Sequence, residues 1–309
     1  GAIGSNKELG NLIFNSGGKT TLNDVKASSL TTDRPGTTQL NGNVTTTTSQ
    51  TYEDPVTVSG KLTATQGDIT FQSPVTLQNN VLVDTSAGAG NIIFNQTVNG
   101  NNDLTLKAGN GNLTFKDATS LGNLKIENAN NVELAAITAS SITQIAGTGT
   151  TTFNGPVTTN ASGGINLIGT NFAIEKQVTT QNQGTFTVNN SGNFNTAADA
   201  NLNLDGAFTQ SGTGNVNIAS NITTTNDNIT FNSPVTLTNK VFFDTGAGAG
   251  NIVFNNTVNG NNDLTLNADT GDIIFTGAID LRNIIANTAG KTTFNAVTAN
   301  SLTTDADGN

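Results

Sequence analysis

The chain has 309 residues and a formal net charge of −10, and it contains no His, Cys, Met or Trp. Without Cys and His it can form neither disulfides nor the nitrogen- and sulfur-ligated metal sites typical of zinc and copper. Its 12 Lys and Arg residues are scattered, which argues against a nucleic-acid partner and against binding to an anionic membrane surface, because both need clustered positive charge.

The first residues, GAIGSNKELG, show neither the charged n-region nor the apolar h-region of a secretory signal. No apolar run further along approaches the ~18 residues of a membrane span. Charged residues make up only 11% of the chain, so Asn, Thr, Ser, Gln and Gly must cover most of its surface. We therefore expect neither a membrane-spanning segment nor a nucleic-acid-binding face.

A short repeat runs through the chain from its beginning. An apolar or aromatic residue, usually followed by Asn and a brief turn, recurs in phrases such as TLNDV, TFQSPV, IFNQTV and TFNSPV. The first series of these anchors lies 19 to 23 residues apart, at Tyr52, Phe71, Phe94, Phe115, Leu134, Phe153 and Phe172. A second series, at Phe231, Phe254, Phe275 and Phe294, has spacings of 23, 21 and 19. Self-similarity near 20 residues is typical of a solenoid.

The residues around each anchor predict short strands. In GNIIF at 90–94, Ile92 and Phe94 point one way and Ile93 the other, and LTL at 104–106 repeats the alternation. Alternation over three to five residues, bounded by Gly, Asn, Asp and Pro, is the pattern of strands joined by tight corners. We expect one coil to hold two or three such strands and successive coils to stack in parallel.

Longer copies are superimposed on this short period. Residues 68–106 and 228–266 match at 30 of 39 positions, and residues 17–33 and 289–305 match at 12 of 17. The register is less regular between about 173 and 226. We interpret residues 1–309 as a single array of roughly 15 coils, each of about 19–23 residues, in an all-β fold.

Asn follows many anchors, and we expect these residues at equivalent places in the coils: Asn23, Asn41, Asn95, Asn154, Asn232, Asn255 and Asn295. Stacked amides can form a hydrogen-bonded ladder. The alternative is a row of Asn that binds carbohydrate.

Residues 29–58 and 67–94 resemble the repeats of large filamentous-haemagglutinin-like adhesins, which are bacterial surface exoproteins, many of them exported by two-partner secretion. The resemblance covers most of the chain and is weakest from about 173 to 226. It implies a right-handed parallel β-helix and an extracellular or cell-surface location. The secretion domain of that family is not visible here, so the segment resembles an interior stretch of a longer array.

Several patterns could carry chemistry, and each has a structural explanation. NGNNDLTL, at 99–106 and 259–266, resembles calcium-binding nonapeptides, but such sites need tandem copies; we expect Asp103 and Asp263 to cap turns. Glu53 and Asp54 are adjacent, so they should point to opposite faces, unlike a glycosidase carboxylate pair. Arg34 and Arg282 are the only arginines, and neither has an acidic cluster near it in the sequence, as a lyase would need.

Two further motifs favour structure in the same way. AGAG at 87–90 and 247–250 lacks the Lys-Ser/Thr of a phosphate loop and predicts a glycine corner. The Thr runs at 45–48 and 150–152 lack the regular Thr-x-Thr of an ice-binding surface.

The sequence therefore predicts no catalytic residues, no cofactor-binding residues and no metal ligands, and we expect no enzymatic activity. The expected function is that of an extracellular structural or adhesive rod, a stiff stalk or fibre segment of a secreted bacterial surface protein. Its expected partners are other copies of itself or cell-surface and matrix glycans. The alternatives are a subunit that assembles end to end into a filament or sheath and, less favoured, a carbohydrate-active β-helix enzyme.

Overall fold

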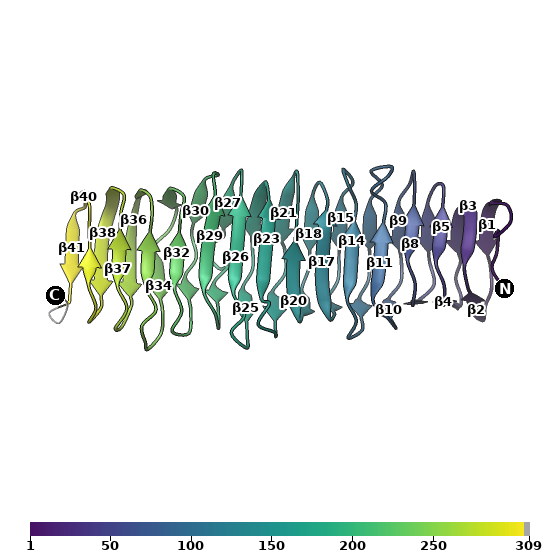
Figure 1. Ribbon diagram of the computed structural model, residues 1–309, viewed down its shortest axis with the longest axis horizontal. Coiled ribbons are helices and arrows are strands. Elements are labelled where there is room, and N and C mark those ends of the chain that lie inside the picture. Colours follow the sequence, from purple (N-terminus) through teal and green to yellow (C-terminus); the bar gives the residue numbers. More distant parts are fainter. Residues whose placement is uncertain (306–309) are drawn as a thin grey trace. The chain divides into compact units, whose positions relative to one another are not determined.

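In the computed structural model, which describes residues 1–305, every regular element is a β-strand. The chain forms two compact units, residues 1–151 and 152–309. Each is a parallel β-solenoid, and together they contain about 14 turns with no helix among the described residues (Figure 1). The predicted fold class is confirmed, with about 14 turns in place of 15. Within residues 1–305, no helix exists that could cross a membrane.

Each turn of the first unit contributes a strand to three parallel columns. The column that carries the aromatic anchors consists of β6 (Gln50–Tyr52), β9 (Ile69–Phe71), β12 (Ile92–Phe94), β15 (Leu113–Phe115) and β18 (Val132–Leu134). The second consists of β2 (Lys19–Leu22), β4 (Thr37–Leu40), β7 (Val56–Val58), β10 (Val75–Leu77), β13 (Val98–Asn99), β16 (Thr119–Ser120) and β19 (Ile137–Ala139). The third consists of β5 (Val44–Thr46), β8 (Leu62–Ala64), β11 (Val81–Asp84), β14 (Leu104–Lys107), β17 (Asn123–Asn128) and β20 (Ser141–Gln144). At the N-terminal end, β1 (Leu9–Phe14) pairs with β3 (Val25–Thr32), and β3 pairs onward with both β5 and β6.

The second unit has the same three-column construction. One column consists of β23 (Ile165–Gly169), β26 (Phe186–Asn190), β29 (Phe208–Gly212), β32 (Ile229–Phe231), β35 (Ile252–Phe254), β37 (Ile273–Phe275) and β39 (Thr292–Thr293). Another begins with β24 (Asn171–Ile174), β27 (Phe194–Thr196), β30 (Val216–Ile218) and β33 (Val235–Leu237). The third begins with β22 (Val157–Thr159), β25 (Val178–Thr180), β28 (Leu202–Asn203), β31 (Ile222–Thr223) and β34 (Val241–Asp244). The last two columns share the long strands β36 (Val258–Asn267) and β38 (Ile279–Asn287), and end with β40 (Val297–Thr298) and β41 (Ser301–Thr304). The remaining strand, β21 (Thr150–Phe153), contains the residues at which the first unit ends and the second begins.

The predicted alternation sets the inward and outward sides of the short strands. In β12, Ile92 and Phe94 are buried and Ile93 is half-buried, as the sequence pattern indicated. β-Branched residues at the outward positions favour the extended backbone. The predicted turn lengths are also confirmed, because the parallel pairing advances by 23, 21 and 19 residues from Ile69 through Ile92 and Leu113 to Val132.

Aromatic side chains stack along the inside of each unit at the strand spacing. In the first unit the ring centroids of Phe71 and Phe94 lie 4.8 Å apart, and those of Phe94 and Phe115 lie 4.7 Å apart. In the second unit Phe254 lies 4.7 Å from Phe275. Parallel strands about 4.8 Å apart place equivalent side chains directly above one another. Each such aromatic contact contributes about 0.5–1.5 kcal/mol beyond the burial of area.

The second unit shows a feature that the anchor series does not reveal. The stretch from 173 to 226 forms strands with the same parallel pairing as the rest. However, Phe172 lies in the column that leads through Phe194 and Val216 to Val235, whereas Phe231 lies in the neighbouring column of β32. The two anchor series therefore occupy different sides of the turn.

Candidate functional site

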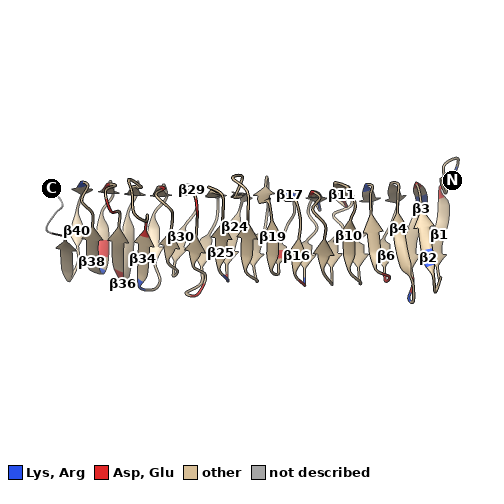
Figure 2. Cartoon of the chain, turned by 90° about the horizontal axis from the view of Figure 1, so that it is seen from below, with Lys and Arg blue, Asp and Glu red and all other residues tan. Residues whose placement is uncertain are grey.

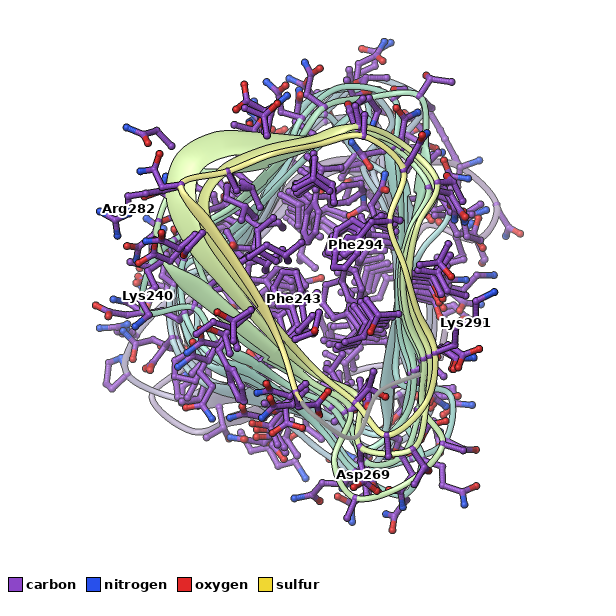
Figure 3. All side chains as sticks on the ribbon, turned by 90° about the vertical axis from the view of Figure 1, so that its left-hand side faces the viewer. Lys240, Phe243, Asp269, Arg282, Lys291 and Phe294 are labelled. Carbon is purple, nitrogen blue, oxygen red and sulfur yellow. The ribbon has the colours of Figure 1, made fainter. Side chains whose placement is uncertain are left out.

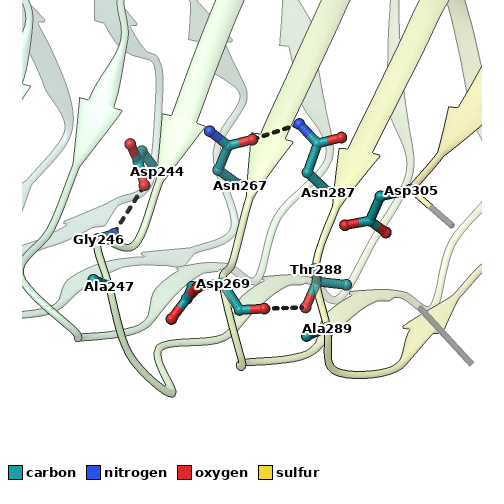
Figure 4. A pocket seen from close by; sticks show the side chains of 9 residues that line it. All are labelled: Asp244, Gly246, Ala247, Asn267, Asp269, Asn287, Thr288, Ala289 and Asp305. Carbon is teal, nitrogen blue, oxygen red and sulfur yellow. Dashed lines mark hydrogen bonds between the residues drawn. The ribbon is translucent and has the colours of Figure 1, made fainter. Parts of the chain in front are cut away.

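A cavity of about 560 Å³ opens at one corner of the second unit (Figure 4). Its lining consists of Asp244, Gly246, Ala247, Asn267, Asp269, Asn287, Thr288, Ala289 and Asp305. Figure 3, seen from the C-terminal end, shows Asp269 at a corner of the turns and Phe243 and Phe294 in the interior. The cavity therefore lies outside the apolar core, on the surface of the corner.

The strand register brings the upper lining residues together. Asp244, Asn267 and Asn287 are paired positions on β34, β36 and β38, one turn apart. The Asn287 amide Nδ2 donates to Asn267 Oδ1 at 2.7 Å, and the backbone N–H of Gly246 donates to Asp244 Oδ1 at 2.9 Å. These side chains thus form a row of polar groups along the corner, one carboxylate and two amides, and the amides offer N–H donors as well as acceptors.

The lower lining is a tight backbone turn. Asp269 has a left-handed φ of 46°, a conformation that Asp tolerates better than most residues. Thr288 Oγ1 lies within hydrogen-bonding distance of the Gly271 carbonyl and, at 3.1 Å, of the Asp269 carbonyl, which share its single O–H, and it accepts from the Gly290 N–H at 2.9 Å. The Thr288 hydroxyl is therefore committed to holding the corner and is not an available nucleophile.

The chemistry of this cavity is that of an acceptor-rich surface. Three carboxylates and two amides line it, with no Lys or Arg among the lining residues. Within residues 1–305, no group of three or more His, Cys, Asp or Glu side chains is arranged to hold a metal ion. The cavity can accept hydrogen bonds from hydroxyl or ammonium groups, and the lining offers no nucleophile paired with a general base.

The residues at the copied positions of the first unit form ion pairs. Lys61 Nζ lies 3.3 Å from Asp84 Oδ2, and Lys107 Nζ lies 2.6 Å from Glu127 Oε2. Burial raises the pKa of Asp84, but hydrogen bonds from Ser86 and the nearby Lys61 ammonium outweigh it and hold that pKa below its ordinary value. Asp84 and Asp244 are copies, so the acceptor row of the second unit arises where Lys107 and Glu127 are replaced by Asn267 and Asn287.

The two Asp residues considered as calcium ligands join neighbouring turns of the solenoid. Asp103 Oδ1 accepts from the backbone N–H and the side-chain Nδ2 of Asn123, at 2.8 and 2.9 Å. Asp263, which lies within β36, accepts from Asn283 Nδ2 at 2.8 Å and from both Nε and Nη2 of Arg282, at 2.7 and 2.6 Å. Each carboxylate thus contacts residues one turn further on, and the local Asx-type cap stays a prediction.

Other sequence predictions are resolved by the same contacts. Asp54 is buried at 1% exposure and accepts from Thr38 Oγ1, whereas the neighbouring Glu53 is half-buried; the two point apart as predicted. Arg34 donates to the Glu53 carbonyl at 2.8 Å and to Ser73 Oγ at 2.9 Å.

The AGAG motif at 87–90 forms a turn. A Cβ on Gly90 would lie 2.0 Å from the Gly67 carbonyl oxygen. The predicted glycine corner is therefore confirmed.

Arg282 forms an ion pair that its neighbours in the sequence do not reveal. Asp263 lies against its guanidinium, with Arg282 Nη2 2.6 Å from Asp263 Oδ2 (Figure 3 labels Arg282 on the outer surface). The two residues are 19 positions apart, which is one turn, so they become neighbours only when the chain coils.

The Asn ladder is confirmed in part. Asn255 Nδ2 donates to Asn232 Oδ1 at 2.8 Å, and Asn95 Nδ2 donates to Gln72 Oε1 at 2.7 Å. However, Asn23 and Asn41 follow β2 and β4, which belong to a different column from β12, the strand before Asn95. The expectation that all these Asn residues are equivalent is wrong, because more than one strand of a turn carries the same anchor-Asn motif.

A second series of hydrogen bonds between turns involves Asx residues that precede the strands, which the anchor-Asn motif does not include. In the first unit, Asn91 Oδ1 accepts from the Asn112 N–H at 2.9 Å, and Asn112 Oδ1 accepts from the Asn131 N–H at 3.1 Å. In the second, Asn251 Oδ1 accepts from the Asp272 N–H at 2.6 Å. These Asx residues precede the strands, and the signal for them is the Gly-Asp or Gly-Asn pair at 67–68, 90–91, 111–112, 250–251 and 271–272.

Over residues 1–305, charged side chains form no continuous stripe. Figure 2 shows acidic and basic residues scattered along the chain and separated by long uncharged stretches.

No known protein family, no curated protein and no solved structure matches this chain significantly.

Proposed function

We propose that this chain is a structural and adhesive segment of an extracellular bacterial surface protein, a β-helical stalk or fibre segment. The observation that carries the proposal is the repetition of the turn itself. The described strands pair with equivalent strands one turn away, and the inward side chains pack on their copies. Such a fold gives a regular, mostly uncharged polar exterior, which suits an exposed scaffold.

The location and the family are supported by the resemblance of residues 29–58 and 67–94 to filamentous-haemagglutinin-like repeats. Antibodies against the purified chain should label the outer surface of intact cells of the source bacterium or its culture supernatant. Protease treatment of intact cells should remove that label. Label that appears only after the cells are permeabilised would overturn the extracellular assignment.

The adhesive part of the proposal concerns glycans. The acceptor-rich corner of Asp244, Asn267 and Asn287 is the surface that we assign to hydroxyl-bearing ligands. On a glycan array the chain should be retained, and replacing the Asn pair by the charged pair of the first unit, Asn267→Lys with Asn287→Glu, should reduce retention. Uniform absence of retention would remove the adhesive role and leave a spacer.

A second candidate is a subunit that assembles end to end. It is based on the similarity of residues 17–33 and 289–305, which match at 12 of 17 positions. Unpaired strands invite pairing with another chain. Light scattering after size-exclusion chromatography, followed by electron microscopy, should show concentration-dependent filaments if this candidate is right and monomers if it is not.

We further propose that the chain is not an enzyme. A panel of polysaccharides incubated with the protein, with and without calcium, should release no products. Reproducible release of oligosaccharides would favour the carbohydrate-active alternative, and substitution of Asp244, Asp269 or Asp305 would then test the corner cavity as its site.

A further inference from the structure

The outward side chains of three neighbouring strands in the second unit border a groove. Strands β34, β36 and β38 pair in parallel, one turn apart, so their outward residues line up in rows along the solenoid. The first row is Lys240, Asp263 and Asn283, and the second row is Phe242, Thr265 and Ile285. A groove of about 310 Å³ lies between the two rows, and its lining includes all of these residues except Phe242.

The two rows differ in chemistry. In the first row, the Asp263 carboxylate accepts from the Arg282 Nε and Nη2 groups at 2.7 and 2.6 Å, which compensate its charge. Lys240 is exposed, and its ammonium forms no ion pair within residues 1–305. In the second row, Ile285 is 40% exposed and Phe242 is half-buried. The groove is therefore bordered by one row with an uncompensated positive charge and by one row that is largely apolar.

Phe242 is an aromatic residue at an outward position. Its neighbour Phe243 is fully buried, and Figure 3 shows Phe243 in the interior. The Phe242 backbone N–H donates to Asn221 Oδ1 at 2.9 Å, which ties this position to the preceding turn. With Thr265 and Ile285, the Phe242 ring forms an apolar strip beside polar groups, which is the usual lining of a ligand site.

The copied turns of the first unit carry different residues at this face. The counterparts of Lys240, Phe242 and Ile285 are Asn80, Leu82 and Lys125. Asn80 Oδ1 accepts from the backbone N–H of Asp103 at 2.9 Å, and Lys125 Nζ pairs with Glu127 at 3.0 Å. In the second unit the positive charge thus lies in the first row, where it is not paired within the described residues, and the second row is apolar.

We propose that this groove binds a linear glycan that carries carboxylates, with one sugar ring packed on Phe242 and its carboxylate bound by the Lys240 ammonium. These two side chains lie two residues apart on one side of an extended strand, about 6.6 Å along it. The C–H groups on one face of a pyranose ring pack on an apolar side chain, while its hydroxyls face polar groups such as Thr265 and Asn283. This inference rests on the proposed adhesive role and names the class of glycan.

Neighbouring groups set the direction of the ligand. Asp244 lies two residues beyond Phe242 on the same side of β34, so like-charge repulsion directs a bound carboxylate away from Asp244 and towards Lys240. Successive turns are about 4.8 Å apart, which is close to the length of one sugar residue. A linear oligosaccharide along the solenoid axis can therefore place further rings over Thr265 and Ile285.

The test is an NMR titration of the 309-residue chain with tri-galacturonate and, separately, with its methyl ester, which keeps the rings and removes the charge. The acid should bind about fivefold more tightly than the ester. The backbone amide shifts should be largest at Lys240, Thr265 and Ile285. Both titrations use the same low salt concentration, because salt screens exposed charges.

Substitutions that install the residue of the first-unit copy test the two contacts separately. Lys240→Asn, as at Asn80, should weaken binding of the acid about fivefold and leave binding of the ester unchanged. Phe242→Leu, as at Leu82, should weaken both ligands about two- to tenfold, because the contact with the ring is lost. Lys291→Asn is the matched control, since it removes the same charge from the opposite side of the second unit (Figure 3), and it should change neither affinity.

Equal affinity for the acid and the ester would overturn the proposal, as would equal losses from Lys240→Asn and Lys291→Asn. Tri-glutamate that binds as tightly as tri-galacturonate and is insensitive to Phe242→Leu would also overturn it, because the groove would then attract any acidic chain. Retention on the glycan array that depends on Asn267 and Asn287, together with no shifts in the groove, would leave the adhesive role standing without this site. The reverse result would support the groove and remove the corner.

Discussion

At the scale of single residues, the turns are joined by polar contacts that span one coil. The Arg282 guanidinium and Asp263 form a two-point contact of this kind, with Asn283 as a third partner. Hydrogen bonds from Arg282 and then from Asn283 lower the pKa of Asp263 to about 2. In the first unit the position of Arg282 is occupied by Gly122, and the Asp103 carboxylate accepts hydrogen bonds from Asn123.

The first prediction concerns the titration of Asp263. Because its folded-state pKa lies below the ordinary 3.8, its contribution to stability is present above about pH 4 and is lost as the pH falls through about 2. Arg282→Gln should raise the pKa of Asp263 towards 3.8, measured by NMR titration of the carboxyl carbon. An unchanged pKa of Asp263 would show that the guanidinium does not set it.

A second polar feature lies in the core of the second unit. Gln210 is fully buried in the column that otherwise carries Val188 and Phe231. Its Nε2 donates to Asn190 Oδ1 at 2.9 Å and to Ser233 Oγ at 3.1 Å, and its Oε1 accepts from the Ser233 N–H at 3.1 Å. Buried polar groups are tolerated when all are paired in this way.

Gln210→Leu should destabilise the second unit by about 2–4 kcal/mol, because it leaves the Asn190 and Ser233 groups buried without their partner. Urea titration followed by circular dichroism measures the change. Thr209→Val, at the adjacent half-buried outward position, is the matched control and should alter stability by less than about 0.5 kcal/mol. Equal effects of the two substitutions would show that the network contributes nothing specific.

Single residues were the hardest to assign from the sequence. The opposite sides of Glu53 and Asp54 follow from strand alternation alone and were predictable. The contact of Arg282 with Asp263 was not, because it depends on the length of one particular turn. The Asx ladder of Asn91 and Asn112 could have been found from the Gly-Asx pairs, since an Asx before a strand can accept the N–H of its copy on the next turn.

At the scale of the strand and its corner, close stacking of backbone requires glycine. Gly90, Gly111 and Gly271 precede strands, and a Cβ on Gly271 would lie 2.0 Å from the Gly250 carbonyl oxygen. Contacts this short force the neighbouring turn to shift. The Gly-Asx pair thus combines two functions, since Gly allows the turns to approach and Asx ties them together.

Gly271→Ala should therefore destabilise the second unit by more than about 2 kcal/mol, as expected for overpacking against rigid backbone. Gly10, in β1, has no atom within 4 Å of the position that a Cβ would take, and Gly10→Ala should be neutral or stabilise by up to about 1 kcal/mol. Thermal unfolding of the two variants measures both signs. A neutral Gly271→Ala would contradict the close approach at this corner.

The strands themselves were largely predictable, but their assignment to columns was not. Alternation of apolar and β-branched residues identified segments such as 92–94 and 229–231. Each turn, however, contains three strands that can carry the same apolar-x-apolar pattern. The aromatic anchor changes column between Phe172 and Phe231, and only the pairing of β24 and β32 with their neighbours reveals this.

At the scale of the whole molecule, periodicity alone indicated the parallel solenoid. The number of turns was overestimated because the count assumed about 20 residues per turn, whereas the pairing advances by 22 from Phe172 to Phe194 and by 23 from Ile229 to Ile252. The extra residues lie in the corners, where the hydrophobic pattern gives no signal. The sequence constrains the function less than the fold, since Asn and Thr are common both in tight corners and in the polar surfaces of ligand-binding proteins.

A solenoid is stabilised mainly by contacts between neighbouring turns, so a turn with one neighbour should open more readily than a turn with two. Two segments of the chain allow this difference in opening to be measured. Residues 17–33 and 289–305 share most of their sequence and should therefore have similar intrinsic exchange rates. In hydrogen-exchange mass spectrometry, the peptide covering 289–305 should exchange at least about tenfold faster than that covering 17–33. The difference should persist on dilution and in the presence of a calcium chelator, because neither peptide contains an expected metal ligand. Equal protection of the two peptides would mean that the exposed edge of β41 is already covered in solution, and dilution would then reveal whether a second copy covers it.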